Sequence, residues 1–395
     1  MAEGSRRRFS YVKESSFGVD PGGNYQIVRA LEGAGFNLDR TQLTSQEYRS
    51  DRAISTTRLG AKRLRFPLPF ELSYGSHEDF IESAMCNAWV AAGDASSALQ
   101  VTVVAGSTNT MAATGIGTGI VAGDWVKVAG FATALAANNG WYRVTTAAAN
   151  LLTFAEAKTT AGASTLSAGT SAEATVTVQK MSAIVSGTTD KSLVMEQAQL
   201  DIPLYYQLLG CMAGSLSLSI RPDSIVTGSF DMMCKELTST SPRNTTYAGT
   251  AVAATTTEPM DANTATAALK IDGTPVAIVT GLDLNLNNNL AEFWPVFQTT
   301  PYKFGKGRSN LTGSMSLYLL ADTYWVKYLA ETNVALSIQL MNPAGTNGYV
   351  IDIPSVEMTS LRDSATENNV VSNINWQALY NSTLGYVNMK IAKLS

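Results

Sequence analysis

The stretch "LRFPLPFELSYGSHEDFIESAM", residues 64–85, changes its hydrophobic period from that of a strand to that of a helix. Its first part alternates apolar and polar residues, which is typical of a strand with one buried face. Its second part spaces apolar residues by one, three and four positions, as an amphipathic helix does. Pro67 and Pro69 lack N–H groups on the same side of the strand, which predicts a sheet edge or a bulge there. We therefore expect a strand that leads directly into a helix.

The start of this helix is rich in polar residues. Ser76 is expected at the N-cap with Asp79 as its capping-box partner, and acidic residues in a first turn are favoured by the helix dipole. His77 is the only histidine in the chain, and we expect it to be exposed at the first helical position. Glu78 and Asp79 could in principle act as an acid–base pair. A helix start is the better-supported interpretation.

Composition favours a β-rich protein whose two ends differ in charge. Only 15% of the 395 residues are charged and 45% are hydrophobic, with abundant Ala, Thr, Ser and Gly. Residues 1–65 hold 12 of the 28 Lys and Arg residues and 7 of the 32 Asp and Glu residues, so this end carries +5 and the rest of the chain −9. Oppositely charged ends suit head-to-tail self-association as well as they suit binding to nucleic acid.

The chain has no hydrophobic run long enough for a membrane span and no hydrophobic core of a signal peptide near its start. We therefore expect synthesis and folding in a cytosol. Cys86, Cys211 and Cys234 are odd in number and lack the spacing of metal ligands. Reduced, buried thiols are the predicted state.

Four segments are distinguished by their composition. Residues 1–35 combine Arg6 to Arg8 with scattered aromatics and predict an extended arm. The polar, arginine-rich stretch from Thr44 to Lys62 predicts a long hairpin loop. Residues 97–180 contain 7 charged residues in 84 and short strands between turn signals, which predicts a small β-barrel or sandwich. Residues 241–270 are expected to form a linker or a long surface loop.

The strand-to-helix corner occurs twice in the chain. A strand, a polar loop, a second strand and a helix recur so that Phe66 matches Leu311 and Phe80 matches Trp325. A later match, "IVTGSFDMMC" with "VVSNINWQAL", lies 100 residues closer, which requires inserted material in the first copy. This predicts a first domain of residues 36–96 and 181–240, an insert of residues 97–180 and a second domain of residues 271–395. The alternative is that two unrelated strand-loop-strand-helix units look alike.

Motifs of catalysis and ligand binding are incomplete. "GKGRS" from Gly305 lacks the P-loop pattern, and "GIGTG" from Gly115 lies in a low-complexity segment rather than in a dinucleotide fingerprint. "DLNLNNN" from Asp283 starts like a calcium loop but has Asn and Trp where that loop needs Gly and Glu. We predict no catalytic residue, no metal and no cofactor, and therefore a structural role rather than an enzyme.

Four segments together resemble the tail tube (major tail) protein family of long-tailed, siphovirus-type bacteriophages. They are "YVKESSFGVDPGG", "FNLDRTQLTSQEYRSDRAISTTRLGAKR", "PFELSYGSHEDFIESAM" and "GCMAGSLSLSIRPDSIVTGSFDMMCKE". The resemblance implies a mainly β fold of tandem-duplicated tube domains, each a β-sandwich or barrel with a flanking helix, plus the small inserted all-β domain. It also implies a virion protein that self-assembles into stacked rings, the conduit for genome delivery.

The resemblance further implies contacts and partners. The stretch from Thr44 to Lys62 becomes a stacking loop, the N-terminal segment an inter-ring arm, and the insert an outer decoration. Three chains per ring would supply six domains, with a true hexamer as the alternative. Further expected partners are the tape measure, tail terminator and distal tail proteins and DNA passing without specific binding, after assembly in the host cytoplasm. The residues expected at contacts between subunits or rings are Tyr11, Phe17, Val19, Arg49, Asp51, Arg52, Arg58, Phe304, Lys306 and Arg308.

Three other functions remain open at this point. Another virion part, such as a tail terminator or a capsid decoration protein, would share the β-rich composition. A carbohydrate-active β enzyme could use Glu78 and Asp79. A nucleic-acid-binding module could use Arg6 to Arg8 and the arginine-rich loop.

Overall fold

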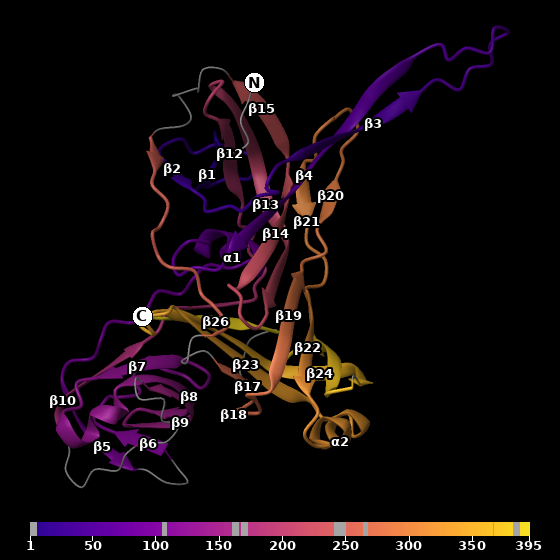
Figure 1. Cartoon of the computed structure of the whole chain (residues 1–395). Helices are drawn as coiled ribbons and strands as arrows, with labels where there is room; N and C mark the ends of the chain where they lie inside the picture. Colours follow the sequence, from indigo (N-terminus) through magenta and orange to yellow (C-terminus); the bar gives the residue numbers. More distant parts are fainter. Residues whose placement is uncertain are drawn as a thin grey trace.

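The computed structural model describes residues 6–104, 109–159, 166, 173–240, 250–263, 268–365, 367–381 and 388–395. The chain is mainly β, as predicted. Its strands form one large sheet system, a closed barrel and a two-stranded ribbon, and the described residues contain two α-helices (Figure 1).

A first set of six elements, here called the first unit, forms an antiparallel sheet with one helix. Its strand order is β3-β4-β14-β13-β12, and α1 packs on β13. β1 and β15 add to this sheet beside β12 and β13. The elements are β3 (Asn37–Thr44), β4 (Thr57–Glu71), α1 (Glu78–Met85), β12 (Leu193–Gln199), β13 (Leu204–Ile220) and β14 (Thr227–Cys234), with β1 (Arg7–Lys13), β2 (Tyr25–Ile27), β11 (Ala183–Val185), β15 (Glu236–Thr240) and β16 (Ala251–Val252) around them.

A second set of elements, the second unit, repeats this topology. Its strand order is β19-β22-β25-β24-β23, with α2 on β24 and β26 in the place of β15. The elements are β19 (Val279–Asn287), β22 (Asn310–Tyr318), α2 (Thr323–Leu329), β23 (Val334–Met341), β24 (Gly348–Ala365), β25 (Val370–Ala378) and β26 (Lys390–Leu394), with β17 (Ala268–Ile271), β18 (Thr274–Pro275), β20 (Ala291–Phe293) and β21 (Lys303–Gly305) beside them.

The two units also share their irregularities. The ladder between β13 and β14 shifts register at Gly214, and the ladder between β24 and β25 shifts at Thr359. Bulges are local features of a particular backbone, so their agreement aligns the two units residue by residue. In this alignment, the residue of β14 that pairs with Phe66 corresponds to the residue of β25 that pairs with Gly313. Phe66 therefore corresponds to Gly313 rather than to Leu311.

The two units meet edge to edge within the chain. β19, the first strand of the second unit, pairs with the last part of β13, from Ser215↔Asn287 to Ile220↔Leu282. One hydrophobic cluster runs through both units and includes Phe66, Phe230 and Trp376. The internal contact is therefore both a continuous sheet and a shared core.

Six strands between residues 99 and 180 form a closed barrel with a core of its own. Its strands are β5 (Leu99–Val104), β6 (Asn109–Ala112), β7 (Trp125–Ala129), β8 (Gly140–Ala148), β9 (Leu151–Thr159) and β10 (Glu173–Lys180). The sequence of the barrel is inserted between α1 and β12 of the first unit, but the barrel packs against the second unit (Figure 1). Trp125 Nε1 donates to Asp352 on β24 at 2.8 Å, and Trp141 packs in the same cluster as Leu394.

The predicted strand-to-helix corner is present. Leu64, Phe66, Leu68 and Phe70 of β4 are buried, and α1 follows at Glu78. The edge predicted from Pro67 and Pro69 is also found, since β3 pairs with β4 only up to residue 65 and β14 alone pairs beyond it.

The start of α1 differs from the prediction. His77 is fully buried rather than exposed, and its ring lies 4.5 Å from the ring of Phe70. It also takes the N-cap position expected for Ser76, whose hydroxyl bonds to Ser73 at 2.6 Å instead of capping the helix. The difference arises because segments distant in sequence close over this turn, including Arg29, whose carbonyl contacts His77 Nε2 at 3.3 Å.

The N-terminal segment, predicted as an extended arm over residues 1–35, is paired with its own chain from Arg7 to Lys13. β1 pairs along its length with β12, from Arg7↔Gln199 to Lys13↔Leu193, and Phe9 and Tyr11 are buried. The edge of β12 needs a strand partner, and the short alternation in "RRFSYVK" supplies one with a buried face. Residues 1–5 lie outside the described residues.

Two further expectations need correction. Cys211 and Cys234 form a disulfide rather than reduced thiols, because the β13–β14 register places their Cα atoms 4.0 Å apart; Cys86 is free and buried. The expected linker of residues 241–270 contains paired segments, since β16 pairs with β2 and β17 pairs with β23. Within this range, residues 241–249 and 264–267 lie outside the described residues.

Candidate assembly surfaces

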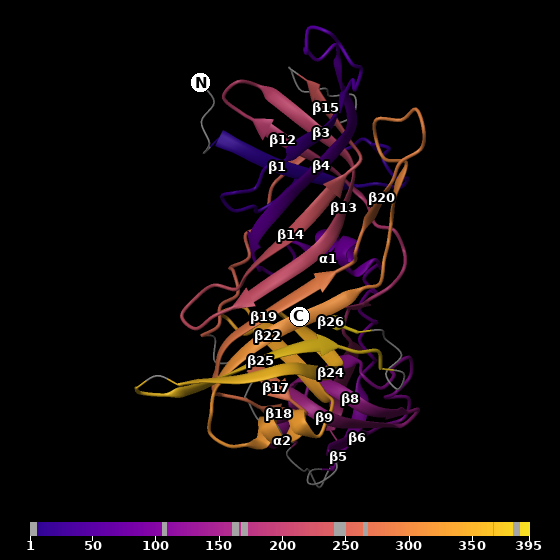
Figure 2. The same ribbon diagram turned by 90° about the vertical axis from the view of Figure 1, so that its right-hand side faces the viewer.

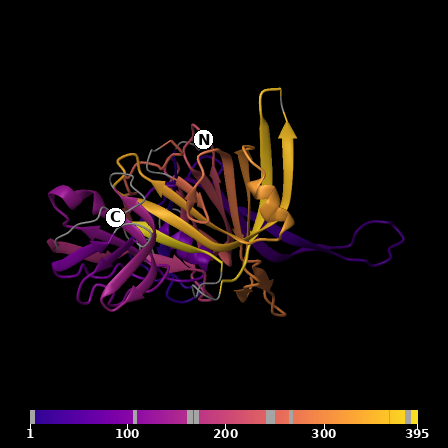
Figure 3. The same ribbon diagram turned by 90° about the horizontal axis from the view of Figure 1, so that it is seen from below.

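The β3–β4 hairpin projects from the body of the molecule (Figures 1 and 3). Arg49, Asp51, Arg52 and Arg58, all expected at contacts, are exposed on it. Two hydrogen bonds of 3.0 and 2.7 Å join the Arg49 guanidinium to the Asp51 carboxylate, and they lower the pKa of that carboxyl. The hairpin also exposes a set of apolar side chains, namely Leu43, Tyr48, Ile54 and Leu59. Such a surface suits contact with another molecule.

The second unit carries its own loop at the corresponding place, between β19 and β22. It contains the β20–β21 ribbon, and its tip exposes Val296 and Phe297. Tyr48 of the first hairpin and Phe297 of this loop are both fully exposed. The loop packs against the base of the first hairpin through Glu292, which lies 3.2 Å from Arg63 and 3.3 Å from Arg65. Both units therefore present an aromatic tip from the same connection.

Tyr11 is used inside the chain. Its ring centroid lies 4.8 Å from that of Phe80, and its hydroxyl donates to Asp79 at 2.8 Å. Burial, together with the neighbouring Asp79 carboxylate, raises the pKa of the tyrosine well above its usual value. The Tyr11 side chain joins β1 to α1, so little of its surface is left for contact with a neighbouring subunit.

Phe17 and Phe304 form a contact between the two units. Their rings meet edge to face with centroids 5.5 Å apart, and Phe304 is buried with Met212 and Met233. Lys235 Nζ lies 5.6 Å from the centroid of the Phe17 ring. Val19, two residues beyond Phe17, is exposed. Of this group, Val19 offers the most surface to another chain.

Lys306 and Arg308 follow β21 and differ in their surroundings. Lys306 Nζ lies 2.5 Å from an Asp190 carboxylate oxygen and also contacts the carbonyl of Thr188. Arg308 is exposed, and its carbonyl accepts a hydrogen bond from Asn289 at 2.8 Å. Lys306 therefore ties the second unit to the segment before β12, while the Arg308 side chain faces solvent.

The acidic pair at the start of α1 is engaged with lysines from two distant strands. Asp79 lies 2.6 Å from Lys13 Nζ on β1, and Glu78 lies 2.5 Å from Lys393 Nζ on β26. Each carboxylate thus fastens a strand to the helix. This arrangement favours the helix-start interpretation over acid–base chemistry.

Two residues at the internal contact were not singled out as contact residues from the sequence. Asp283 on β19 accepts from Arg221 at 2.6 Å and from Ser219 at 2.9 Å. Burial by itself would raise its pKa, but these hydrogen bonds outweigh that effect and lower it. Asn288 lies between α1 and β13, where its Nδ2 donates to the carbonyl of Ala84 at 2.8 Å. Both belong to "DLNLNNN", and the run of polar residues in this segment is the sequence feature that could have identified them.

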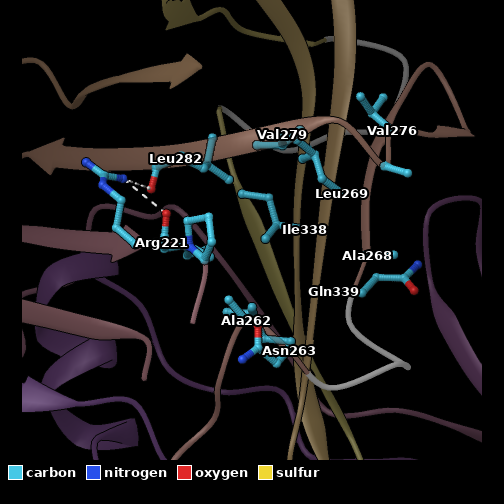
Figure 4. Close-up of a pocket in the computed structure, with 15 residues that line it drawn as sticks. Arg221, Ala262, Asn263, Ala268, Leu269, Val276, Val279, Leu282, Ile338 and Gln339 are labelled. Atoms are coloured by element: carbon cyan, nitrogen blue, oxygen red, sulfur yellow. Dashed lines mark hydrogen bonds between the residues drawn. The ribbon is translucent and has the colours of Figure 1, made fainter. Parts of the chain in front are cut away.

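A pocket lies beside this contact, between β17, β19 and β23 (Figure 4). Its walls are mainly apolar and include Leu269, Val279 and Ile338. Arg221 lies at one side and donates to the carbonyl of Leu282 at 3.3 Å. The residues that line the pocket include no acidic side chain and no histidine, so they offer no acid–base pair.

The comparison with known families decides among the open functions. A family model described as phage tail tube protein matches residues 4–378. The chain belongs to the phage tail tube protein family. It is therefore a structural component of the virion tail, in a family of structural proteins rather than of enzymes. No individual curated protein matches the chain.

Family membership confirms the resemblance seen in the four sequence segments. Within the part of this tail tube protein that the structure describes, neither helix is long and apolar enough to cross a membrane. The same residues contain no group of three or more His, Cys, Asp or Glu side chains placed to hold a metal ion.

Proposed function

We propose that this tail tube protein self-assembles into rings that stack into the tube through which the genome passes. The observation that carries the proposal is the repetition of one topology in two units that already join edge to edge through β13 and β19. A contact that joins two like units head to tail gives a ring when its rotation closes on itself, and an open helical filament when it does not. One chain is then two neighbouring positions of such a ring.

The proposed ring contains three chains, which supply six units in a pseudo-hexamer. The domain boundaries proposed for it are residues 36–96 with 181–240 and residues 271–395, with the barrel of residues 97–180 on the outside. The barrel is held by the end of β26 and the start of β24, away from the β3–β4 hairpin (Figure 1). A true hexamer of chains is the second possibility.

Stacking between rings is assigned to the two hairpin loops. Both loops expose an aromatic residue at the tip, Tyr48 in one and Phe297 in the other. Among the residues expected at contacts, Val19, Arg49, Asp51, Arg52, Arg58 and Arg308 are the exposed ones. DNA, the tape measure, tail terminator and distal tail proteins are the proposed partners along the tube, and the net charge of −4 suits DNA that passes without tight binding.

Electron microscopy of the purified protein tests the proposal. Tubes should form, alone or with other tail components, and end-on class averages with the mass per ring should give three chains. Six chains per ring would overturn the pseudo-hexamer. A protein that stays monomeric under all assembly conditions would overturn the tube and favour a decoration protein.

A further inference from the structure

The contact between the two units has a second, open counterpart at the other end of the chain. In the internal contact, β19 pairs with Ser215–Ile220 of β13. The matching bulges align this part of β13 with Ser360–Ala365 of β24. β23 pairs with β24 only as far as Val356, and among the described residues no strand pairs with the same edge of β24 beyond that point. The β24–β25 hairpin extends away from the body there (Figure 2).

A pocket beside this open edge matches the place that Asn288 fills in the first unit. Asn288 is buried between α1 and β13, and it contacts the carbonyls of Ala84 and Ala213. The corresponding pocket lies between α2 and β24 and is lined by Leu329, Met358 and Thr359, with Glu331 and Glu357 at its sides. The helices differ accordingly, since six residues of α1 are buried and none of α2 is.

The first unit carries a strand that matches β19 and has an open edge of its own. β3 pairs with β4 on one side, and its residues are almost entirely exposed. The cross-strand partners align Asp39 with Asn287 and Arg40 with Asn288. Arg40 is exposed, with only hydrogen bonds of 3.4 Å to carbonyls of β4.

We propose that β3 of a second copy of this chain pairs with the open edge of β24 and places Arg40 in the pocket between α2 and β24. The internal contact sets the register: Asp39, Leu38 and Asn37 of one copy lie opposite Ser360, Leu361 and Arg362 of the next. The charges are complementary, because the pocket has two glutamates where the first unit has Cys86 and Met212. Lys327, which also lines the pocket, is already paired with Asp272 at 2.5 Å.

This contact explains why the two units differ at equivalent positions. Inside the chain, the neutral Asn288 donates to backbone carbonyls of α1 and β13; between chains, Arg40 meets a pocket with two glutamates at its sides. Distinct partners at the two contacts keep β3 from competing for the internal site. The inference rests on the proposed ring and names the surfaces that join its chains.

A charge exchange tests the inference. Arg40→Glu and Glu357→Arg should each reduce tube formation by at least tenfold, because like charges then meet in the pocket. The double variant should recover assembly, since the introduced glutamate then meets the introduced arginine at the side of the pocket. Both residues are exposed, and thermal unfolding should show that all variants are folded. Glu258→Arg, at an exposed site away from the pocket, is the matched control and should assemble normally. Single variants that assemble like the wild type, or a double variant that does not recover, would overturn the inference.

A cross-link tests the register independently. One chain carrying Asn37→Cys is mixed with another carrying Arg362→Cys, and oxidation should give a disulfide-linked dimer because opposed Cβ atoms are close. Val121→Cys on the barrel replaces Asn37→Cys in the control and should give no dimer. Tubes without the cross-link would refute this contact while leaving the proposed function intact. Failure of the wild type to form tubes would refute the function, and the dimer would then still report the contact in solution.

Discussion

Lys390 of β26 and Asp124 of the barrel form a buried ion pair, with 2.9 Å between Nζ and Oδ1. Lys390 also donates to the carbonyl of Gly123 at 2.7 Å, and Lys180 lies 2.7 Å from the other carboxylate oxygen. Burial alone would raise the pKa of Asp124, but the charge of Lys390 and hydrogen bonds from both lysines lower it. The barrel is thus held on the second unit by a buried ion pair.

Lys390→Met should loosen this docking. Removing Lys390 leaves the buried Asp124 carboxylate with Lys180 as its cationic partner, so the free energy of unfolding should fall by less than the roughly 3 kcal/mol expected when a buried charge loses its partner altogether. The double variant Asp124→Asn, Lys390→Met should recover part of the loss, which urea denaturation measures. Asp51→Asn, which breaks the exposed pair with Arg49, is the control and should leave the unfolding midpoint unchanged. Equal midpoints for Lys390→Met and the wild type would show that the pair does not hold the barrel.

His77 should make stability depend on pH. Burial lowers its pKa from 6.5 to about 4, with the nearby positive charge of Arg29 acting in the same direction. Because the unfolded chain binds the proton more readily, the free energy of unfolding is highest above pH 6.5 and falls as the pH drops towards 4. The loss from this group approaches about 3 kcal/mol at the acid end.

His77→Phe should remove that part of the pH dependence. The ring still packs on Phe70, although the hydrogen bond to Arg29 is lost at every pH. Urea denaturation of both proteins between pH 4 and 8 gives the difference between their free energies of unfolding. The contribution from titration of the carboxylates is the same in both proteins and cancels in this difference. Parallel curves for the two proteins would show that His77 is not buried as a neutral ring.

The spacing of apolar residues along the chain predicted those strands and helices that bury a single face. The alternation from Leu64 to Phe70 and the apolar spacing from Phe80 onward reflect one buried face each, so β4 and α1 were found. β1 was missed because only Phe9 and Tyr11 alternate in it, and its partner β12 lies far away in the chain. The burial of His77 likewise depends on distant segments.

The candidate contact surfaces were predicted in part. The exposed arginines of the β3–β4 hairpin follow from a polar stretch between two strands, whereas the inward positions of Tyr11 and Phe304 follow from packing that no local pattern reports. The sequence did not show that Arg40 and Asn288 occupy equivalent positions in the two units. The sequence match of the two hairpins was wrong by two residues at Phe66. Only the cross-strand partners restore the register.

The aromatic tips should control stacking. Tyr48→Ala combined with Phe297→Ala removes the most exposed aromatic side chain of each loop, so rings should form but stack into fewer and shorter tubes. Val121→Ala on the barrel is the control, since Val121 is exposed away from both loops. Electron microscopy gives the tube lengths, and sedimentation separates rings from tubes. Tubes of normal length from the double variant would remove these loops from the stacking contact.

The disulfide should be visible in thiol counts. Alkylation of the denatured, unreduced protein should modify Cys86 alone, and reduction should expose Cys211 and Cys234 as well. Mass spectrometry of the intact chain distinguishes one modification from three. Three modifications without reduction would restore the expectation of free thiols.

Gly313 should be essential to the packing of the second unit. A Cβ atom at this position of β22 would lie 2.2 Å from the Trp376 ring and 2.3 Å from the carbonyl oxygen of Asp283. Trp376 is fully buried across the strand from Gly313, and Asp283 belongs to the contact between the units, so neither side yields easily. Gly313→Ala should therefore lower the free energy of unfolding by about 1–3 kcal/mol, the usual cost of overpacking a core. Gly60→Ala is the matched control on β4, because a Cβ there meets nothing closer than 3.4 Å. Thermal or urea unfolding of the two variants should separate them clearly, and equal stability would mean that Trp376 does not lie against the backbone of β22.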